Sequence, residues 1–223
     1  MSGGVFPRYC RALIFDLDGV LTDTAELHYR AWKRLADEIG VPFDERVNLR
    51  LKGVDRAASL DIILERATRS YSAEEKHALT DRKNGYYKSA IATFGKENLF
   101  PGVTELLREA HAKGLRTALA SASRNAPALL DRLGIAEVFD AIADPAQARP
   151  KPSPDLFLAA ASALGIAPQD CIGIEDAAAG IAAIKAAGMA AIGIGDPADL
   201  AQADAVLPRI GDLRLEEFIL QEH

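Results

Sequence analysis

The stretch ALIFDLDGV, residues 12–20, begins as an apolar run and then places two aspartates and a glycine at its end. A short apolar run of this kind is typical of a strand that is buried on both faces of a parallel sheet. In such sheets, ligands bind outside the carboxyl ends of the strands. The stretch therefore predicts a core strand that presents Asp16 and Asp18 to a ligand.

Short β-rich runs alternate with longer helical segments through most of the remaining chain. The predicted strands are residues 12–18, 116–121, 140–144, 171–176, 190–195 and 205–208. The predicted helices between them are residues 103–114, 124–134, 153–165 and 177–188. Each of these helical segments stops at a glycine, as a left-handed C-cap requires. The alternation predicts an α/β fold with a doubly wound parallel, Rossmann-like sheet.

Residues 24–96 interrupt this alternation, because they contain amphipathic segments and no convincing strand. The clearest segments are AELHYRAWKRLADEIG, residues 25–40, and EEKHALTDRKNGYYKSAIATF, residues 74–94. We therefore expect an α/β core made of residues 1–23 and 97–223, with a helical cap at residues 24–96 inserted after the first strand.

The amino-acid composition limits the kinds of molecule that this protein is expected to bind. The chain has 223 residues, 49% hydrophobic content and a net charge of −6, and it lacks the dense basic cluster that binding to nucleic acid needs. No apolar run is long enough to span a bilayer, and the first residues lack the layout of a signal peptide. Two distant cysteines, Cys10 and Cys171, suggest buried apolar positions and no disulfide framework. We expect a cytoplasmic monomer with a small-molecule ligand, no nucleic acid and no membrane.

Candidate site residues, most of them polar, recur where the predicted strands end. They are Asp16 and Asp18, then Ser121, Ala122 and Ser123, then Lys151 in the loop after the third strand, then Glu175 and Asp176. A helix N-cap is an equally good explanation for Ser123 taken alone. The acids as a set need another explanation, because like charges about 4 Å apart repel by roughly 4 kcal/mol at an effective dielectric constant near 20. Oxygen ligands of this kind favour Mg²⁺.

The two opening aspartates suit different tasks. Gly19 allows the chain to turn sharply after Asp18, so Asp16 can face the ligand while Asp18 lies beside it. A carboxylate next to Mg²⁺ can attack phosphorus, and a neighbouring carboxyl group can exchange a proton with the leaving oxygen. The pair therefore indicates phosphoryl transfer.

These residues resemble the haloacid dehalogenase superfamily of phosphotransferases. The four motifs appear in order as FDLDGVLTD (15–23), the serine-bearing strand end, RPKPSPD (149–155) and GIEDAAAG (173–180). Further segments are similar to the β-phosphoglucomutase family, namely TDTAELHYRAW (22–32), LKGVDRAASL (51–60), DRKN (81–84), ASASRNAP (120–127) and DAIADPA (140–146).

The resemblance implies roles for the core residues. Asp16 would be the nucleophile and Asp18 the general acid and base, and the metal would be held by Asp16, the Asp18 carbonyl and Asp176, with Glu175 in or near its ligand shell. The transferring phosphoryl group would be held by Ser121, Ala122 and Lys151, and the sugar-phosphate side would be lined by Ser123, Arg124 and Asn125. Arg124 replaces the lysine of some relatives, and the segment before Lys151 is a residue shorter than usual and stiffened by Pro150.

The cap segment LKGVDRAAS offers a second cationic pole with Lys52, Gly53, Arg56 and Ser59. A solvated turn leading into a helix is the alternative for this segment taken alone. A sugar bisphosphate has two anionic ends, so an enzyme that holds one end while it reacts at the other needs such a pole. The resemblance further implies substrate contacts for Lys83 and a link from His28 to the placement of Asp18, while Thr24 is expected at a helix N-cap, at the hinge, or at both.

The resulting expectation is a Mg²⁺-dependent isomerase that interconverts β-glucose 1-phosphate and glucose 6-phosphate. The reaction would pass through an aspartyl phosphate and a β-glucose 1,6-bisphosphate intermediate, which would also activate the enzyme. A phosphohydrolase that uses the same aspartyl phosphate is the alternative. A non-catalytic phosphometabolite sensor is disfavoured because Asp18, the proton-transfer residue, is present.

Overall fold

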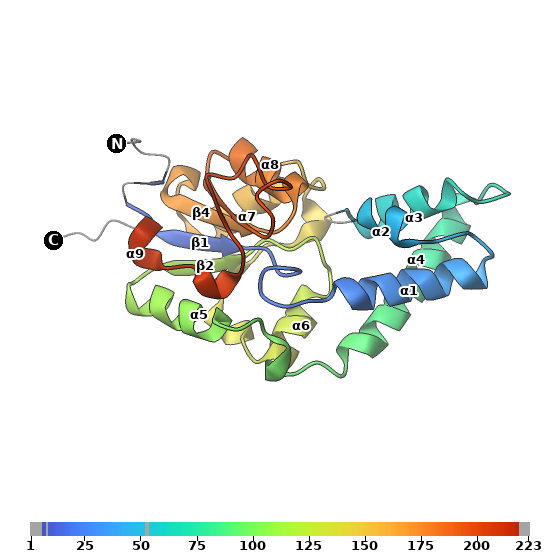
Figure 1. The fold of residues 1–223 in the computed structure, drawn as a ribbon, viewed down its shortest axis with the longest axis horizontal. Helices are drawn as coiled ribbons and strands as arrows, with labels where there is room; N and C mark the ends of the chain where they lie inside the picture. The colour runs from blue at the N-terminus through green and yellow to red at the C-terminus, as the bar shows by residue number, and fades with distance from the viewer. Residues whose placement is uncertain (1–5, 8, 52–53, 219–223) are drawn as a thin grey trace. The chain divides into compact units, whose positions relative to one another are not determined.

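A computed structural model describes residues 6–7, 9–51 and 54–218 and divides the chain into two compact units (Figure 1). One unit comprises the chain up to Asp23 together with the chain from Gly95 onwards, and the other comprises Thr24–Phe94. The second unit starts at the residue predicted for the cap and ends two residues before the predicted boundary.

The first unit is built on a parallel sheet with strand order β3-β2-β1-β4-β5-β6, which has six strands in the described part of the chain. The strands are β1 (Ala12–Phe15), β2 (Arg116–Leu119), β3 (Ala141–Ile142), β4 (Cys171–Glu175), β5 (Ala190–Ile194) and β6 (Ala205–Leu207). This is the strand order of a doubly wound fold, so the predicted fold class is confirmed. Each strand ends one to three residues earlier than predicted.

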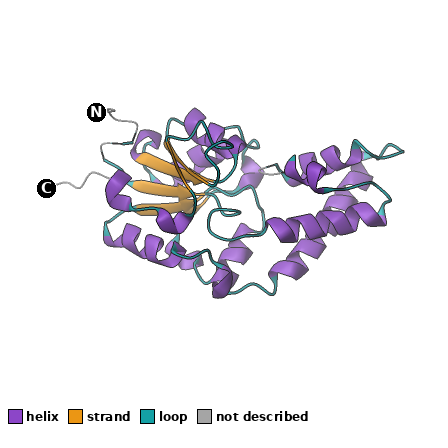
Figure 2. Ribbon diagram, viewed as in Figure 1, coloured by secondary structure: helices purple, strands orange, loops and turns teal. Residues whose placement is uncertain are grey.

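Burial on both faces explains why β1 reads as a continuous apolar run. All four of its residues are buried. Ala12 and Ile14 belong to an apolar cluster with residues of α7 (Asp155–Leu164) and α8 (Ala178–Ala186). Side chains alternate along a strand, so Phe15 points to the opposite face, where its ring lies 6.1 Å from that of Phe139. Figure 2 shows the helices covering both faces of the strands.

The remaining helices of this unit are α5 (Val103–Ala112), α6 (Ala126–Leu133) and α9 (Leu215–Phe218). Short 3₁₀ turns lie at η1 (Lys96–Asn98), η2 (Ala136–Val138), η3 (Pro145–Gln147), η4 (Pro168–Asp170) and η5 (Ile210–Asp212). Helices α6 and α7 end at Gly134 and Gly165, which have φ values of +68° and +67°. Only glycine adopts this left-handed conformation without a steric cost, so the predicted C-caps are confirmed at these two helices.

The second unit is helical, with no strand among its described residues, 24–51 and 54–94. Its helices are α1 (Ala25–Glu38), α2 (Glu45–Leu49), α3 (Arg56–Leu64) and α4 (Ala73–Ile91). Trp32 and Leu35 from α1 pack with Leu60 from α3 and Leu79 from α4 in one apolar core. This arrangement agrees with the amphipathic pattern of α1, which buries one face and leaves its charged residues in solvent.

Among the described helices, none combines the length and the apolar character needed to cross a membrane. The two cysteines, Cys10 and Cys171, are buried and not disulfide-bonded. Their predicted burial is confirmed.

Candidate active site

The carboxyl end of β1 lies at the point where the sheet topology reverses. Its neighbours in the sheet are β2 on one side and β4 on the other, and the chain winds outward from β1 in both directions. The Asp16 N–H donates to the Ile174 carbonyl at 2.9 Å, and the Ala120 N–H donates to the Phe15 carbonyl at 2.8 Å. These bonds align the carboxyl ends of all three strands at one edge of the sheet, where open α/β sheets bind ligands.

Three carboxylates meet at this edge of the sheet. Asp16, Glu175 and Asp176 each offer an oxygen, and these oxygens all lie within 4.8 Å of one another. Gly19 has a φ of +82°, and a Cβ atom there would lie only 2.1 Å from Asp176 Oδ2, so the turn after β1 approaches this carboxylate as only glycine allows. A close set of oxygen donors suits a hard divalent cation such as Mg²⁺. The residues therefore fit the metal that the sequence predicts.

Lys151 inserts into the carboxylate cluster. Its Nζ lies 2.7 Å from Asp16 Oδ1 and 3.5 Å from Glu175 Oε1, and its side chain is 2% exposed. The shortened segment before Lys151 therefore still brings it to Asp16, the expected nucleophile. Burial alone would lower the pKa of the Lys151 ammonium, but Asp16 and Glu175 outweigh burial and raise it. Burial and the nearby Asp16 raise the pKa of Glu175 well above its usual range, while Lys151 opposes the shift.

The loop after β2 brings two hydroxyl groups to the same edge of the sheet. Ser121 is buried, and its Oγ accepts a hydrogen bond from the Ser123 N–H at 3.1 Å. The Ser123 Oγ accepts from the N–H of Asn125, the N-cap residue of α6, at 3.3 Å. Ser123 is therefore not the N-cap residue of α6, and its hydroxyl accepts a hydrogen bond within the turn that precedes the helix. A hydroxyl that accepts a bond still has a proton to donate, so both serines keep the chemistry needed to bind a phosphoryl oxygen.

The positions of the predicted core residues differ in exposure. The buried residues are Asp16, Ser121, Asn125, Lys151 and Glu175, the half-buried ones are Asp18, Ala122, Ser123 and Asp176, and Arg124 is exposed. Asp18 lies in the turn after β1, where it forms an isolated bridge with Thr22. The geometry therefore joins residues from four separate sequence motifs at one edge of the sheet.

A second cluster of predicted residues lies within the helical unit. Lys83 is buried on α4, and its Nζ lies 2.8 Å from Nδ1 of His28 on α1. An ammonium group only donates, so Nδ1 accepts and the proton of the neutral imidazole lies on Nε2. The Nζ atom also lies over the rings of Trp32, at 4.7 Å, and Tyr87, at 5.1 Å. These aromatic faces stabilise a buried cation.

Burial and two nearby cations affect the pKa of His28 in this cluster. Burial, then Lys83, then Arg56, together lower the pKa of His28 well below 6.5. The charge of Arg56 therefore acts on His28 even though the two residues lie on different helices. The helical unit thus places two cations around a neutral histidine.

The remaining predicted cap residues have local structural contacts. Arg56 is the first residue of α3, and its N-cap Asp55 accepts from the Ala57 N–H at 2.9 Å. Ser59 is buried, and its hydroxyl donates to the Val54 carbonyl at 3.4 Å. Thr24 is buried at the N-cap position of α1, although its side chain makes no capping bond. Lys52 and Gly53 lie outside the described residues.

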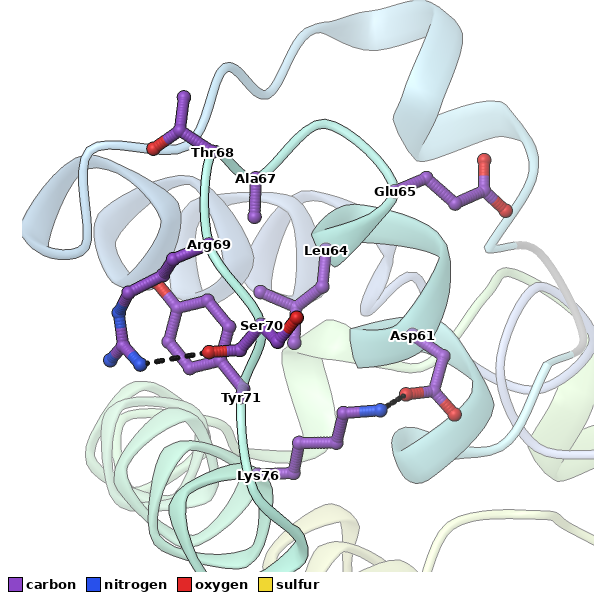
Figure 3. Close-up of a pocket in the computed structure, with 9 residues that line it drawn as sticks. All are labelled: Asp61, Leu64, Glu65, Ala67, Thr68, Arg69, Ser70, Tyr71 and Lys76. Atoms are coloured by element: carbon purple, nitrogen blue, oxygen red, sulfur yellow. Dashed lines mark hydrogen bonds and ion pairs between the residues drawn. The ribbon is translucent and has the colours of Figure 1, made fainter.

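A hollow of about 600 Å³ on the helical unit contains none of the predicted site residues (Figure 3). It is lined by Asp61, Leu64, Glu65, Ala67, Thr68, Arg69, Ser70, Tyr71 and Lys76. Lys76 pairs with Asp61 at 2.7 Å, and Arg69 pairs with Glu75 at 2.8 Å while stacking over Tyr71. Since its two cations are neutralised by carboxylates of the same unit, the hollow lacks the open charge that an anionic ligand needs.

Some residues of the core site escaped prediction. The ring of Phe157 lies 5.1 Å from Lys151 Nζ, and a Cβ atom at Gly180 would lie 1.9 Å from Glu175 Oε1. Gly180 interrupts an alanine-rich helical segment, and a glycine inside a helix often marks a close approach. That signal was available in the sequence, whereas Phe157 reads as an ordinary core residue.

Comparison with known proteins supports these assignments at the level of family. The pattern of haloacid dehalogenase-like hydrolases matches residues 10–188. The chain is 48% identical to a β-phosphoglucomutase of Bacillus subtilis over 92% of each chain. It is 33% identical to a phosphorylated carbohydrates phosphatase of Thermotoga maritima over 80% of this chain and 82% of the relative.

A solved structure gives the same result for the fold. The β-phosphoglucomutase of Clostridium difficile superposes with a TM-score of 0.91 and 43% identity, over 93% of this chain and 95% of that one. The resemblance seen in the sequence motifs and the predicted enzyme class, a phosphomutase, are confirmed by these relatives. The chain belongs to the haloacid dehalogenase-like hydrolase family and, within it, to the β-phosphoglucomutases.

Proposed function

We propose that this enzyme interconverts β-glucose 1-phosphate and glucose 6-phosphate by way of a phosphorylated Asp16. The observation that carries the proposal is the position of Asp16 at the switch point of the sheet, between the Lys151 ammonium and the carboxylates of Glu175 and Asp176. Such a carboxylate is held in place by the lysine and lies where a phosphoryl group would meet the Lys151 ammonium and a cation bound by the neighbouring acids.

The residues of the core divide the chemistry between them. An Asp16 oxygen attacks phosphorus, and the bond between phosphorus and the sugar oxygen breaks. The Asp18 carboxyl gives its proton to that oxygen and recovers one from the next sugar hydroxyl, which then takes the phosphoryl group from Asp16. Lys151 and Ser121, with the backbone of Ala122, hold the phosphoryl oxygens. Asp16, Asp176, the Asp18 carbonyl and Glu175 would hold Mg²⁺, which would supply positive charge to the phosphoryl group.

The phosphate that does not react needs separate binding groups. In the core, Ser123, Arg124 and Asn125 are assigned to it. In the cap, Arg56 and Lys83 supply charge, His28 supplies the Nε2–H donor, and Lys52, Gly53, Ser59 and Thr24 complete the set. The concentration of cations around His28 supports this assignment, because it leaves the helical unit with charge suited to a dianion.

Two anionic ends are expected because we infer β-glucose 1,6-bisphosphate as the intermediate and activator. Between the two half-reactions the bisphosphate would turn around in the site, so that its other phosphate reacts with Asp16. Hydrolysis of a sugar phosphate is the second candidate activity, since the phosphorylated carbohydrates phosphatase of Thermotoga maritima is 33% identical to this chain. The two activities share Asp16 and differ in whether a sugar hydroxyl or water accepts the phosphoryl group.

A product-ratio measurement distinguishes these activities. The enzyme receives β-glucose 1-phosphate, Mg²⁺ and a trace of the bisphosphate, while glucose 6-phosphate and inorganic phosphate are followed together. We expect isomer as the dominant product, and dominant inorganic phosphate would establish the phosphatase instead. Asp16→Asn is the matched control, because an amide is a poor nucleophile and should lower either activity by more than about 10⁴-fold.

We further propose a cytoplasmic monomer as the working form. The free, buried thiols of Cys10 and Cys171 suit a reducing compartment. Sedimentation of the purified chain at working concentration tests the monomer, and a concentration-dependent dimer would contradict it.

A further inference from the structure

The segment RPKPSPD, residues 149–155, carries Lys151 with few backbone hydrogen bonds to hold it. Prolines at positions 150, 152 and 154 have no N–H group, so three of the five residues between Arg149 and Asp155 cannot donate. The Ser153 N–H donates to the Pro150 carbonyl at 2.9 Å and closes a short turn around Lys151. Something else must fix this loop, because Lys151 has to reach two carboxylates in the interior.

Side chains at the two ends of the loop close it. Arg149 Nε and Nη2 donate to the two oxygens of the Asp155 carboxylate at 2.8 and 2.9 Å. The Arg149 N–H donates to the same carboxylate at 3.1 Å, and the Ser153 hydroxyl donates at 2.8 Å. Arg149 and Ser153 hold the pKa of the Asp155 carboxyl well below its usual range. A bidentate pair with two further donors specifies geometry more strictly than a single ion pair does.

The same helix turn also contacts the lysine. Asp155 is the first residue of α7, and Phe157 follows in that turn with its ring 5.1 Å from Lys151 Nζ. Asp155 therefore ties the loop to α7, which contributes Leu156 and Phe157 to the apolar core. Lys151, in the same loop, contacts the carboxylates of Asp16 and Glu175. The side chain of Arg149 is 76% exposed, so its ion pair with Asp155 lies at the surface. The lysine carried by the same loop is buried.

We propose that Arg149 and Asp155 are positioning residues that keep Lys151 Nζ in register with Asp16 during phosphoryl transfer. The inference rests on the proposed function only in taking Asp16 as the residue that becomes phosphorylated. Loss of the bidentate pair between the Arg149 and Asp155 side chains, which we call the clamp, leaves the proline-rich loop with only the Arg149 N–H and Ser153 hydroxyl bonds to Asp155. A small displacement of a catalytic group is costly in rate. An exposed ion pair contributes little to folding, so the loss should appear in the rate and not in the fold.

The test measures the rate at which acetyl phosphate and Mg²⁺ phosphorylate Asp16, followed by mass spectrometry of the intact protein. Arg149→Ala should lower this rate about tenfold, and Arg149→Lys, which keeps one bond, should recover part of the loss. The matched control is Arg209→Ala, because Arg209 is 80% exposed and pairs with Asp212 at 3.2 Å elsewhere on the same unit. That control should stay within about twofold of wild type.

Epistasis tests whether the clamp acts through the lysine. In a Lys151→Met background, Arg149→Ala should change the residual rate by less than about twofold, because the group that it positions is gone. An undiminished tenfold effect in that background overturns the proposal, as does an Arg149→Ala rate equal to that of Arg209→Ala. A wild-type chain that acetyl phosphate does not phosphorylate overturns the proposed function as well, so the two failures are distinguishable.

Discussion

Two buried lysines, one in each unit, have opposite surroundings. Lys151 in the core unit contacts the carboxylates of Asp16 and Glu175, at 2.7 and 3.5 Å. Lys83 in the helical unit donates to the imidazole of His28 and lies over two aromatic rings. The first lysine balances negative charge, whereas the second adds positive charge beside a histidine that is already kept neutral.

The difference shows which ligand charge each unit is suited to receive. Around Lys151 the acids outnumber the lysine, so this site suits a divalent cation. Around Lys83 the neighbouring charge of Arg56 has the same sign, so this site favours an anion. The proposed bisphosphate has two anionic ends, and each of these environments suits one of them.

Removing the core lysine should have the largest effect of the substitutions that compare these two sites. Lys151→Met leaves Asp16 and Glu175 buried without their cation, and we expect the free energy of unfolding to fall by about 3–5 kcal/mol in the absence of Mg²⁺. The loss should be smaller at pH 5 than at pH 8, because the raised pKa of Glu175 lets that carboxyl become neutral as the pH falls. Urea unfolding in EDTA at both pH values measures it.

Lys185→Met is the control for this substitution, since Lys185 pairs with Asp204 and its side chain is 38% exposed. We expect a loss of at most about 1 kcal/mol there. Equal losses for the two variants would show that Lys151 is no more than an ordinary ion-pair partner. Saturating Mg²⁺ should restore part of the stability of Lys151→Met only, because the ion replaces the missing positive charge.

The next effect concerns the anion site of the cap. Arg56→Ala would remove the proposed charge-assisted bond to the non-reacting phosphate, worth about 1.5–3 kcal/mol, so isomerisation of β-glucose 1-phosphate should fall at least about tenfold. Phosphorylation of Asp16 by acetyl phosphate should change much less, because that donor has no second phosphate. Both rates are measured on each variant.

Arg69→Ala provides the matched control, because Arg69 lines the hollow of Figure 3 and belongs to the same helical unit. Its isomerisation rate should stay near that of wild type. A larger effect at Arg69 than at Arg56 would move the anion site to that hollow, and equal losses in both assays would make Arg56 a residue that supports the fold.

The smallest effect is a pH dependence that distinguishes the two lysines. The pKa of His28 is lowered well below 6.5 in the folded chain, so the unfolded chain binds more protons once the pH falls below 6.5. Stability from this group is therefore complete above pH 6.5 and is lost below it, by up to about 1.4 kcal/mol per pH unit. Lys83→Met removes one cause of the lowered pKa and should reduce that loss.

Urea unfolding between pH 7.5 and pH 5 on wild type and Lys83→Met measures this difference, with Lys76→Met as the control. Lys76 lies on the same helix and pairs with Asp61, so its variant should keep the wild-type slope. Identical slopes for Lys83→Met and wild type would mean that Lys83 does not set the pKa of His28.

Local sequence patterns account for much of the fold because their causes are local. A run such as ALIF forms a strand that is buried on both faces, and a glycine after a helical segment provides the left-handed residue that ends α6 and α7. Each of the four motifs lies at the end of a predicted strand or in the loop after it. Because parallel strands all end on one side of the sheet, these positions predict the edge at which the motifs gather. The strand ends were predicted too far along the chain, since the length of a ladder depends on its neighbours.

The contacts that decide chemistry come from packing between distant segments. Lys151 and Asp16 are 135 residues apart in sequence and 2.7 Å apart in space, and Lys83 and His28 are 55 residues apart and 2.8 Å apart. Neither burial nor the sign of the neighbouring charge can be read from a lysine and its flanking residues, because both are set by the elements that pack around it. Residue types therefore predict phosphoryl transfer at the end of β1, and tertiary structure decides that one lysine neutralises acids while the other makes a histidine harder to protonate.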